Sequence, residues 1–87
     1  MLVLVSPKVV SPTPVVRFRP RLELVCAANG TLPIYIAIIR NSRTLVNKAN
    51  TARIQIKEEG NFTCRARSKH GTDERKFIVV MDGESSI

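Results

Sequence analysis

The sequence predicts an all-β domain in which two sheets pack face to face as a sandwich. Short runs of alternating apolar and polar residues recur at intervals of roughly ten residues, separated by turn-forming residues. No stretch sustains the apolar spacing of an amphipathic helix. The two cysteines, Cys26 and Cys64, each share the parity of the apolar residues in their own run. Together these observations favour a β-sandwich.

The first twenty residues are interrupted by Pro7, Pro12, Pro14 and Pro20. Because proline cannot donate a backbone hydrogen bond, this stretch can form only edge strands broken by turns. We expect such edge strands at residues 3–5, 8–10 and 15–18.

The first strong strand is expected at residues 21–27, and it ends at the turn pair Asn29-Gly30. The second, at residues 34–40, is rich in β-branched side chains. After a turn at residues 41–43 we expect a short strand at residues 44–46 and a polar connection at residues 47–51.

Alternation resumes at residues 52–57, and a turn at residues 58–60 leads into the strand of the second cysteine, residues 61–67. A hairpin loop at residues 68–73 is followed by a last strand at residues 75–81. Residues 82–87 are expected to form a flexible tail or linker. Residues 1–81 then make up one domain, since a chain of this length holds a single core.

The expected core consists of apolar residues that share the inward parity of these strands. They are Leu22, Leu24, Ile36, Ile38, Ile54, Ile56, Phe62 and Ala66.

Cys26 and Cys64 are expected to form one buried disulfide between the two sheets. Each thiol points from its own strand into the same core, which places the two side chains for bridging. Such a bridge stabilises the fold by about 4 kcal/mol in the chain-entropy view, a large share of the ~5–15 kcal/mol of a typical domain. The alternative is a pair of buried free cysteines, which are common in protein cores.

The chain has 87 residues and a formal net charge of +7, from 14 Lys and Arg against 7 Asp and Glu. An excess of positive charge favours anionic partners such as glycosaminoglycans, sialylated glycans or acidic proteins, although it also serves solubility. No run approaches the ~20 apolar residues of a membrane span, and residues 1–5 are too short for a signal-peptide core. We interpret the chain as excised from a longer protein.

The sequence gives little material for an enzyme. His70 is the single histidine and lies in an expected loop, without a second histidine or a cysteine cluster to complete a metal site. Bridged cysteines leave no nucleophilic thiol, and the adjacent Glu58 and Glu59 do not converge on a substrate. We therefore expect no catalysis, no metal, no cofactor and no nucleic-acid partner.

Leu24-Val25-Cys26, followed by Glu58-x-Gly60-x-Phe62-x-Cys64-x-Ala66 and Gly71, resembles the B-strand and F-strand signature of immunoglobulin-like domains. The short cysteine spacing is similar to that of compact C2-type and I-type domains. Gly30-Thr31-Leu32-Pro33-Ile34 adds a similarity to the platelet–endothelial adhesion molecule and Fc-receptor-like families. The resemblance implies an immunoglobulin-like sandwich with one inter-sheet disulfide, located at the cell surface.

Two residues depart from that pattern. Immunoglobulin-like domains usually carry a tryptophan on the strand at residues 34–40; this chain has no tryptophan, and we expect Ile36 to fill the space. They also carry a tyrosine two residues before the second cysteine, whose hydroxyl bonds back to the preceding corner. Phe62 occupies that position here, so the packing is kept and the hydrogen bond is lost.

Two N-x-Thr sequons, Asn29-Gly30-Thr31 and Asn61-Phe62-Thr63, are candidate glycosylation sites in a secreted chain. Asn61 is the stronger candidate because Asn61 and Thr63 have the outward parity of their strand.

The candidate binding face follows from the strand order that the resemblance implies, in which the strand at residues 61–67 lies between the strands at 34–40 and 75–81. Its outward residues form a basic and partly apolar surface, with Arg75 or Lys76 beside it depending on register. We expect this face to contain Tyr35, Ile39, Arg40, Arg65 and Arg67. The alternative is an ordinary solvated face.

The sequence thus favours a non-catalytic protein-recognition module from the ectodomain of a cell-surface receptor or adhesion protein, with a membrane-anchored parent. Its partner would be another protein or an adjacent immunoglobulin-like domain. Three alternatives remain: a structural spacer in a multi-domain chain, a basic domain that binds glycosaminoglycans or other anionic glycans, and an intracellular filament-associated domain with reduced cysteines.

Overall fold

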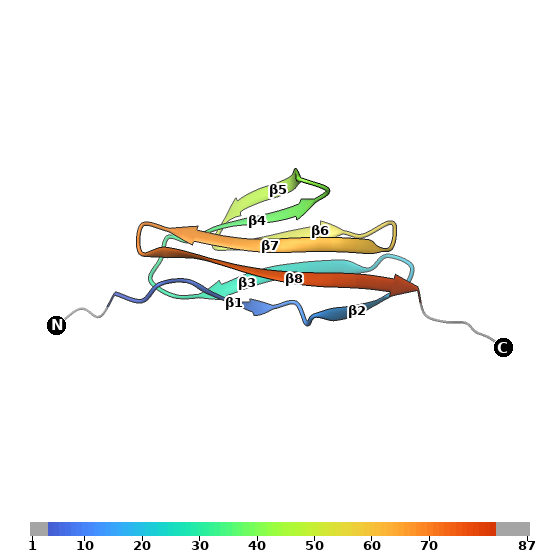
Figure 1. The fold of residues 1–87 in the computed structure, drawn as a ribbon, viewed down its shortest axis with the longest axis horizontal. Helices are drawn as coiled ribbons and strands as arrows, with labels where there is room; N and C mark the ends of the chain where they lie inside the picture. The colour runs from blue at the N-terminus through green and yellow to red at the C-terminus, as the bar shows by residue number, and fades with distance from the viewer. Residues whose placement is uncertain (1–3, 82–87) are drawn as a thin grey trace.

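Two β-sheets pack face to face in the computed structural model, which describes residues 4–81 (Figure 1). One sheet has three strands in the order β1-β3-β6, and the other has five in the order β2-β8-β7-β4-β5. Neighbouring strands are antiparallel except β2 and β8, which run parallel. The strands are β1 (Lys8–Ser11), β2 (Val15–Phe18), β3 (Glu23–Asn29), β4 (Tyr35–Arg40), β5 (Arg43–Ala49), β6 (Thr51–Gln55), β7 (Gly60–Ser68) and β8 (Gly71–Met81). The predicted all-β, two-sheet sandwich is confirmed.

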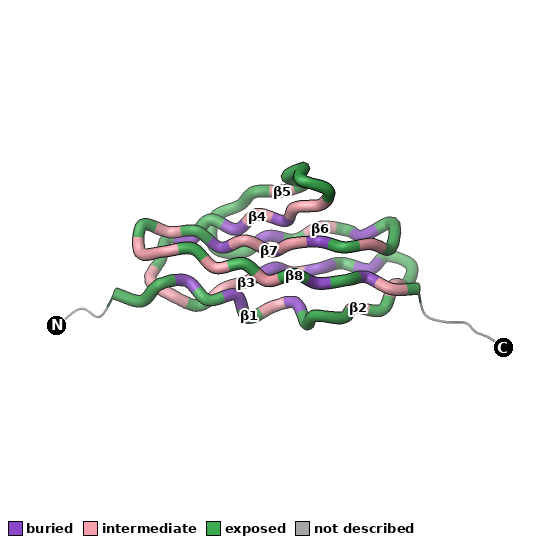
Figure 2. Tube along the Cα trace, in the orientation of Figure 1, coloured by how far each residue is buried: buried purple, intermediate pink, exposed green. Residues whose placement is uncertain are grey.

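Burial alternates along the central strands with the period of two that the sequence pattern indicates (Figure 2). The inward side chains of the two sheets form one core, and none of the buried side chains in residues 4–81 is polar or charged. The buried residues of this core are Val9, Leu22, Leu24, Cys26, Ile34, Ile36, Ile38, Ala52, Ile56, Phe62, Cys64, Ala66, Phe77 and Val79.

Seven of the eight expected core residues are in this set, and the eighth, Ile54, is only half-buried. Ile54 lies opposite Leu24 on β6, the edge strand of the three-stranded sheet, so one side of it reaches the rim of the sandwich. The core also contains apolar residues that the prediction did not include: Val9, Ile34, Ala52, Phe77 and Val79.

Most observed strand bounds differ from the predicted ones by one or two residues, as in β6, which ends at Gln55 and not at residue 57. Three further differences have a structural reason or change an expected loop. Strand β3 begins at Glu23 because residues 19–22 form a turn, in which Arg21 has a φ of 63° and the Leu22 N–H donates to the Arg19 carbonyl oxygen (3.1 Å). Strand β5 extends to Ala49, so the predicted polar connection at residues 47–51 is wrong. Strand β8 begins at Gly71, and the hairpin turn is reduced to Lys69 and His70.

The predicted N-terminal edge strand at residues 3–5 is also not found where the structure describes the chain. Leu4 and Val5 are outside any strand. The Val5 N–H donates to the Thr31 hydroxyl (2.8 Å), and the Val5 carbonyl oxygen accepts from the Thr31 N–H (3.0 Å). Val3 and the expected tail at residues 82–87 lie outside the described residues.

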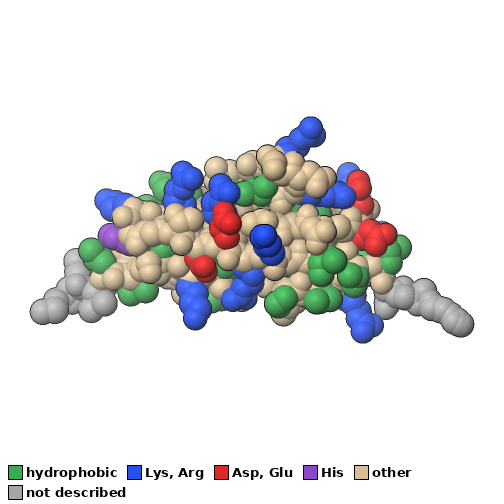
Figure 3. Space-filling view, in the orientation of Figure 1, with side chains coloured by type: hydrophobic (Ala, Val, Ile, Leu, Met, Phe, Trp, Pro, Cys, Tyr) green, Lys and Arg blue, Asp and Glu red, His purple; other side chains and the backbone are tan. Residues whose placement is uncertain are grey.

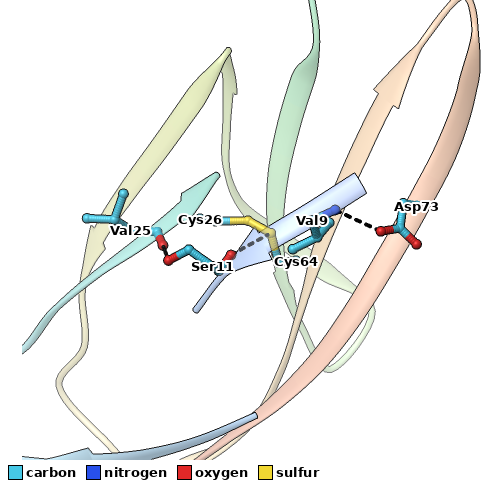
Figure 4. Close-up of a disulfide and its surroundings, with 6 residues drawn as sticks. All are labelled: Val9, Ser11, Val25, Cys26, Cys64 and Asp73. Atoms are coloured by element: carbon cyan, nitrogen blue, oxygen red, sulfur yellow. Dashed lines mark hydrogen bonds between the residues drawn. A yellow bond between two sulfur atoms is a disulfide. The ribbon is translucent and has the colours of Figure 1, made fainter. Parts of the chain in front are cut away.

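The disulfide joins Cys26 of β3 to Cys64 of β7 and so connects the two sheets (Figure 4). The two Cα atoms are 6.2 Å apart, within the usual range for a disulfide. Both cysteines are fully buried. The expectation of one inter-sheet disulfide is confirmed.

Strand β1 crosses beside this disulfide and links both sheets (Figure 4). In its own sheet, the Ser11 hydroxyl donates to the Val25 carbonyl oxygen (2.7 Å). Toward the other sheet, the Val9 N–H donates to the carboxylate of Asp73 on β8 (2.8 Å). The Pro-rich N-terminal segment is therefore fixed to both sheets, although β1 is an edge strand and pairs with only one neighbouring strand.

Candidate recognition face

The outer face of the five-stranded sheet brings together residues from β4, β5, β7 and β8. Arg67 of β7 lies opposite Tyr35 of β4, and Arg65 lies opposite Ala37. Because alternate residues of a strand point to the same side, these four side chains share the solvent face. Tyr35 is 53% exposed although it lies on a strand with neighbours on both sides.

A shallow hollow of about 120 Å³ lies among these residues, lined by Tyr35, Ala37, Thr44, Asn47, Arg65 and Arg67. Ala37 forms its floor, because its small side chain lies opposite Arg65 on one side and Asn47 on the other. The rim carries a phenol, two guanidinium groups, an amide and a hydroxyl. Such a set can donate several convergent hydrogen bonds to a carboxylate or to peptide carbonyls.

The two arginines of the hollow differ in their ion pairing. Arg65 Nε lies 2.6 Å from Glu74 Oε2 on the neighbouring strand β8. Arg67 makes no ion pair with any residue in the described range 4–81, and it is exposed. Arg67 is therefore the guanidinium on this face that is free to meet an anionic group of a partner.

The register also decides which basic residue of the last strand belongs to this face. Lys76 lies opposite Thr63 on the outer side, whereas Arg75 lies opposite the buried Cys64. Glu74, two residues before Lys76 on the same outer side, lies opposite Arg65 and pairs with it. In Figure 3, which shows β7 and β8 toward the viewer, basic side chains are accordingly dispersed and carboxylates lie among them.

Arg40 was expected on this face, and the structure places it elsewhere. It has the parity of the buried Ile36 and Ile38, so its side chain turns toward the core end of the sandwich. Its guanidinium carbon lies 5.3 Å from the centre of the Phe62 ring. Its Nη2 pairs with Glu58 Oε1 (3.2 Å) and donates to the Glu59 carbonyl oxygen (3.1 Å).

These contacts give Arg40 a structural role at the corner between β6 and β7. Phe62 has no hydroxyl to bond to the corner, as expected, and the Arg40 guanidinium bonds to the corner backbone. Gly60, in the same corner, has a φ of +145°, and a Cβ there would lie 3.1 Å from Arg40 Nη2. The backbone of this corner thus requires a glycine, and the Arg40 guanidinium packs against it.

Ile39 does lie on the outer face, but it is half-buried rather than exposed. Its neighbours across the sheet are Thr44 of β5 and Thr63 of β7, whose side chains flank it on the same face. Ile39 does not line the hollow. Of the five residues expected on the face, the hollow contains Tyr35, Arg65 and Arg67.

The two sequons have different surroundings. Asn29 ends β3 and is exposed, but the hydroxyl of its Thr31 already accepts the Val5 N–H. Asn61 is exposed near the start of β7, and no hydrogen bond joins its side chain to a described residue. Both asparagines lie at the surface, as a glycosylation acceptor requires.

Within residues 4–81, no group of three or more His, Cys, Asp and Glu side chains is placed to hold a metal ion. The same residues include no helix with the length and apolar character needed to cross a membrane.

Comparison with known proteins supports the architecture. No protein-family model matches the chain. Over 72 residues it is 29% identical to human sialic acid-binding Ig-like lectin 8, an alignment that covers 75% of this chain and 14% of that protein. The chain therefore spans a small part of that relative's length.

Two solved structures have a similar fold. A crystal structure of the complex of titin M10 with an obscurin-like 1 Ig domain matches with a TM-score of 0.67 at 18% identity, over 94% of this chain and 99% of the other. A mutant of the same complex matches with a TM-score of 0.66 at 19% identity, over 93% and 97%. Together with the inter-sheet disulfide, these similarities show that the chain has an immunoglobulin-like fold.

Proposed function

We propose that this chain is a non-catalytic protein-recognition module that binds its partner through the outer face of the five-stranded sheet. The observation that carries the proposal is the hollow around Tyr35 and Arg67. Tyrosine and arginine are enriched where binding energy concentrates in protein interfaces. A half-exposed tyrosine beside an arginine without an ion pair in the described chain is such an arrangement.

The hollow is well suited to recognition because strands hold it in place before binding. Tyr35 and Arg67 come from β4 and β7, which pair along five residue positions in the middle of the sheet. Side chains on a fixed backbone lose less entropy on binding than those on a loop. The partner is another protein, or an adjacent immunoglobulin-like domain, that offers a carboxylate to Arg67 and an apolar group to Tyr35.

We place this module at the cell surface, in a membrane-anchored parent. The Cys26–Cys64 disulfide supports this, since disulfides persist in oxidising compartments and are rare in the cytosol. We also propose the C2 type for the domain. Only Asn50 separates β5 from β6, so the chain passes between the sheets without a further edge strand.

Charge reversal at Arg67 tests the proposal. A tetramer of the domain is applied to an array of secreted cell-surface ectodomains, and Arg67→Glu is expected to weaken binding to the captured partner by about tenfold or more, a loss of about 1.4 kcal/mol. Lys8→Glu, which makes the same charge change on the three-stranded sheet, is the matched control and should bind like the parent. Equal binding by Arg67→Glu contradicts the proposed face.

An acidic glycan is the second candidate ligand for the same hollow. The named relative is a sialic acid-binding lectin, and the free guanidinium of Arg67 can bind a sugar carboxylate in a bidentate manner while Tyr35 and Asn47 contact the ring. A glycan array with sialylated glycans, the same glycans after sialidase, and heparin separates the possibilities. Binding that sialidase removes, and that Arg67→Lys reduces at least about tenfold, supports this candidate. Binding to heparin alone, lost at moderate salt, indicates non-specific charge attraction.

If the domain binds to neither array, a structural spacer function is favoured. The two ends of the described chain lie at opposite ends of the sandwich (Figure 1), as a spacer in a string of domains requires.

A further inference from the structure

A second hollow lies at the other end of the same outer face, beside the stronger sequon. Its volume is about 240 Å³, and it is lined by Pro14, Asn61, Lys76, Phe77 and Ile78. Asn61 is thus part of the wall of a depression that is otherwise largely apolar.

Beside Asn61, the depression continues as an apolar strip, formed by Ile78 of β8 and Val15 of β2. Asn61 of β7 lies opposite Ile78 of β8, and Ile78 in turn lies opposite Val15 of β2. Ile78 is 36% exposed and Val15 is 59% exposed. The Ile78 N–H donates to the Pro14 carbonyl oxygen (2.9 Å), which holds the β2 end against β8. Apolar side chains gather at this end of the molecule, where β2 and β8 run together (Figure 3).

The sequon itself is open for modification. The side chain of Asn61 is exposed and makes no hydrogen bond to residues 4–81, and Thr63 lies two residues further along the same face. The other sequon also has an exposed asparagine, but its Thr31 hydroxyl accepts the Val5 N–H, and Asn29 lines neither of the hollows described above.

We infer that Asn61 carries an N-linked glycan whose first sugars lie over Ile78 and Val15. In the modification, the Asn61 amide nitrogen forms a bond to the anomeric carbon of a lipid-pyrophosphate-linked oligosaccharide. The bond from that carbon to the pyrophosphate oxygen breaks, the lipid pyrophosphate leaves, and the amide nitrogen loses one proton. The tethered sugar then sets its C–H face on the apolar strip and removes it from water.

This inference rests on the secretory route of the proposed function, and it explains how one face serves two purposes. Arg67 lies six positions after Asn61 on β7, a distance of about 20 Å along an extended strand. The glycan therefore covers the β2 end of the face and leaves the hollow of Tyr35 and Arg67 accessible. A failure of the Arg67→Glu binding test would leave the occupancy of Asn61 unchanged, so the two ideas fail separately.

Occupancy is tested by secreting the full chain from mammalian cells and mapping its peptides by mass spectrometry. Asn61 is expected to be glycosylated in the parent, and either Asn61→Gln or Thr63→Ala is expected to remove that glycan. Asn29→Gln is the matched control and should leave it in place. An unmodified Asn61 in the secreted parent overturns the inference.

Packing of the sugar is tested by a double-mutant cycle between Asn61→Gln and Ile78→Ser. Loss of the glycan should lower the melting temperature by roughly 2–5 °C in the parent and by less than about 1 °C in the Ile78→Ser background. Val15→Ser, on the exposed edge strand, replaces Ile78→Ser if the latter is not secreted. An equal decrease in both backgrounds overturns the packing. Self-association of the glycosylated parent that Val15→Ser abolishes would assign the strip to a second copy and overturn it as well.

Discussion

Replacing Cys26 and Cys64 together by alanine lowers the melting temperature by roughly 15–30 °C and leaves much of the domain unfolded at 37 °C. The bridge closes a 38-residue loop, and opening such a loop increases the entropy of the unfolded chain by about 4 kcal/mol at room temperature. In a domain of this size, each 1 kcal/mol corresponds to about 4–8 °C. This loss is a large share of the ~5–15 kcal/mol that stabilises a typical domain, and removal of the disulfide from a small domain often abolishes folding at 37 °C.

Because of the side chains around it, we expect the disulfide to supply a larger share of the free energy of unfolding than in most immunoglobulin-like domains. The chain has no tryptophan, and we expected Ile36 to fill the space beside the disulfide. The register instead places Ile38 opposite Cys64, and Ile36 lies opposite Ala66. Both isoleucines are fully buried, but each is smaller than a tryptophan. The space beside the disulfide is thus filled by aliphatic groups, and less apolar area is removed from water there.

Thermal melts by circular dichroism compare the oxidised parent, the parent in reductant and the double alanine variant. Cys26→Val with Cys64→Ala is the matched control, because it restores volume without the cross-link and separates the cavity from the loop entropy. Thiol titration of the denatured parent, purified without reductant, should find no free thiol. Two free thiols would favour the intracellular alternative. A cooperative melt of the alanine variant within about 5 °C of the parent would show that the bridge contributes little.

Most of the central strands could be predicted because one of their faces is buried and the other is solvated. That condition produces the alternation read from β3, β4, β6 and β7. Strand β5 gives no such pattern, since it lies at a sheet edge and only Val46 is even half-buried. The first half of β8 carries charged or polar residues on both sides, among them Asp73, which accepts the Val9 N–H. Polar side chains on a strand with long-range partners cannot be distinguished from a loop by periodicity alone.

The candidate site shows the same limit at the level of single residues. Tyr35, Arg65 and Arg67 could be grouped from parity and the expected strand order. The parity of Arg40 with Ile36 and Ile38 was also available, and it predicts the inward orientation that the structure shows. The Arg65–Glu74 pair depends on the register of β7 and β8, which the hairpin turn at Lys69 and His70 sets. No property of the separate strands specifies that register.

Phe62→Ala is expected to destabilise the domain by about 3–5 kcal/mol, the usual cost of removing a buried aromatic ring. The Phe62 ring is buried and stacks on Phe77 of β8, with ring centres 5.3 Å apart and planes at 8°. The Arg40 guanidinium also packs against the ring and bonds to the corner backbone at Glu59. Truncation therefore leaves a cavity, removes an aromatic contact and releases the arginine that fixes the corner.

A cycle with Arg40→Met separates these contributions. Methionine keeps the apolar stem of Arg40 and removes the guanidinium, so the single variant should lose only about 1–2 kcal/mol, from the cation–π contact, the hydrogen bond and the partly exposed ion pair with Glu58. Because both residues act on one corner, the double variant should lose less than the sum of the two, by about 0.5–1 kcal/mol. Urea unfolding of the four proteins measures this. Strict additivity, or a loss below about 1 kcal/mol for Phe62→Ala, would show that the corner is held by the backbone and by Gly60 alone.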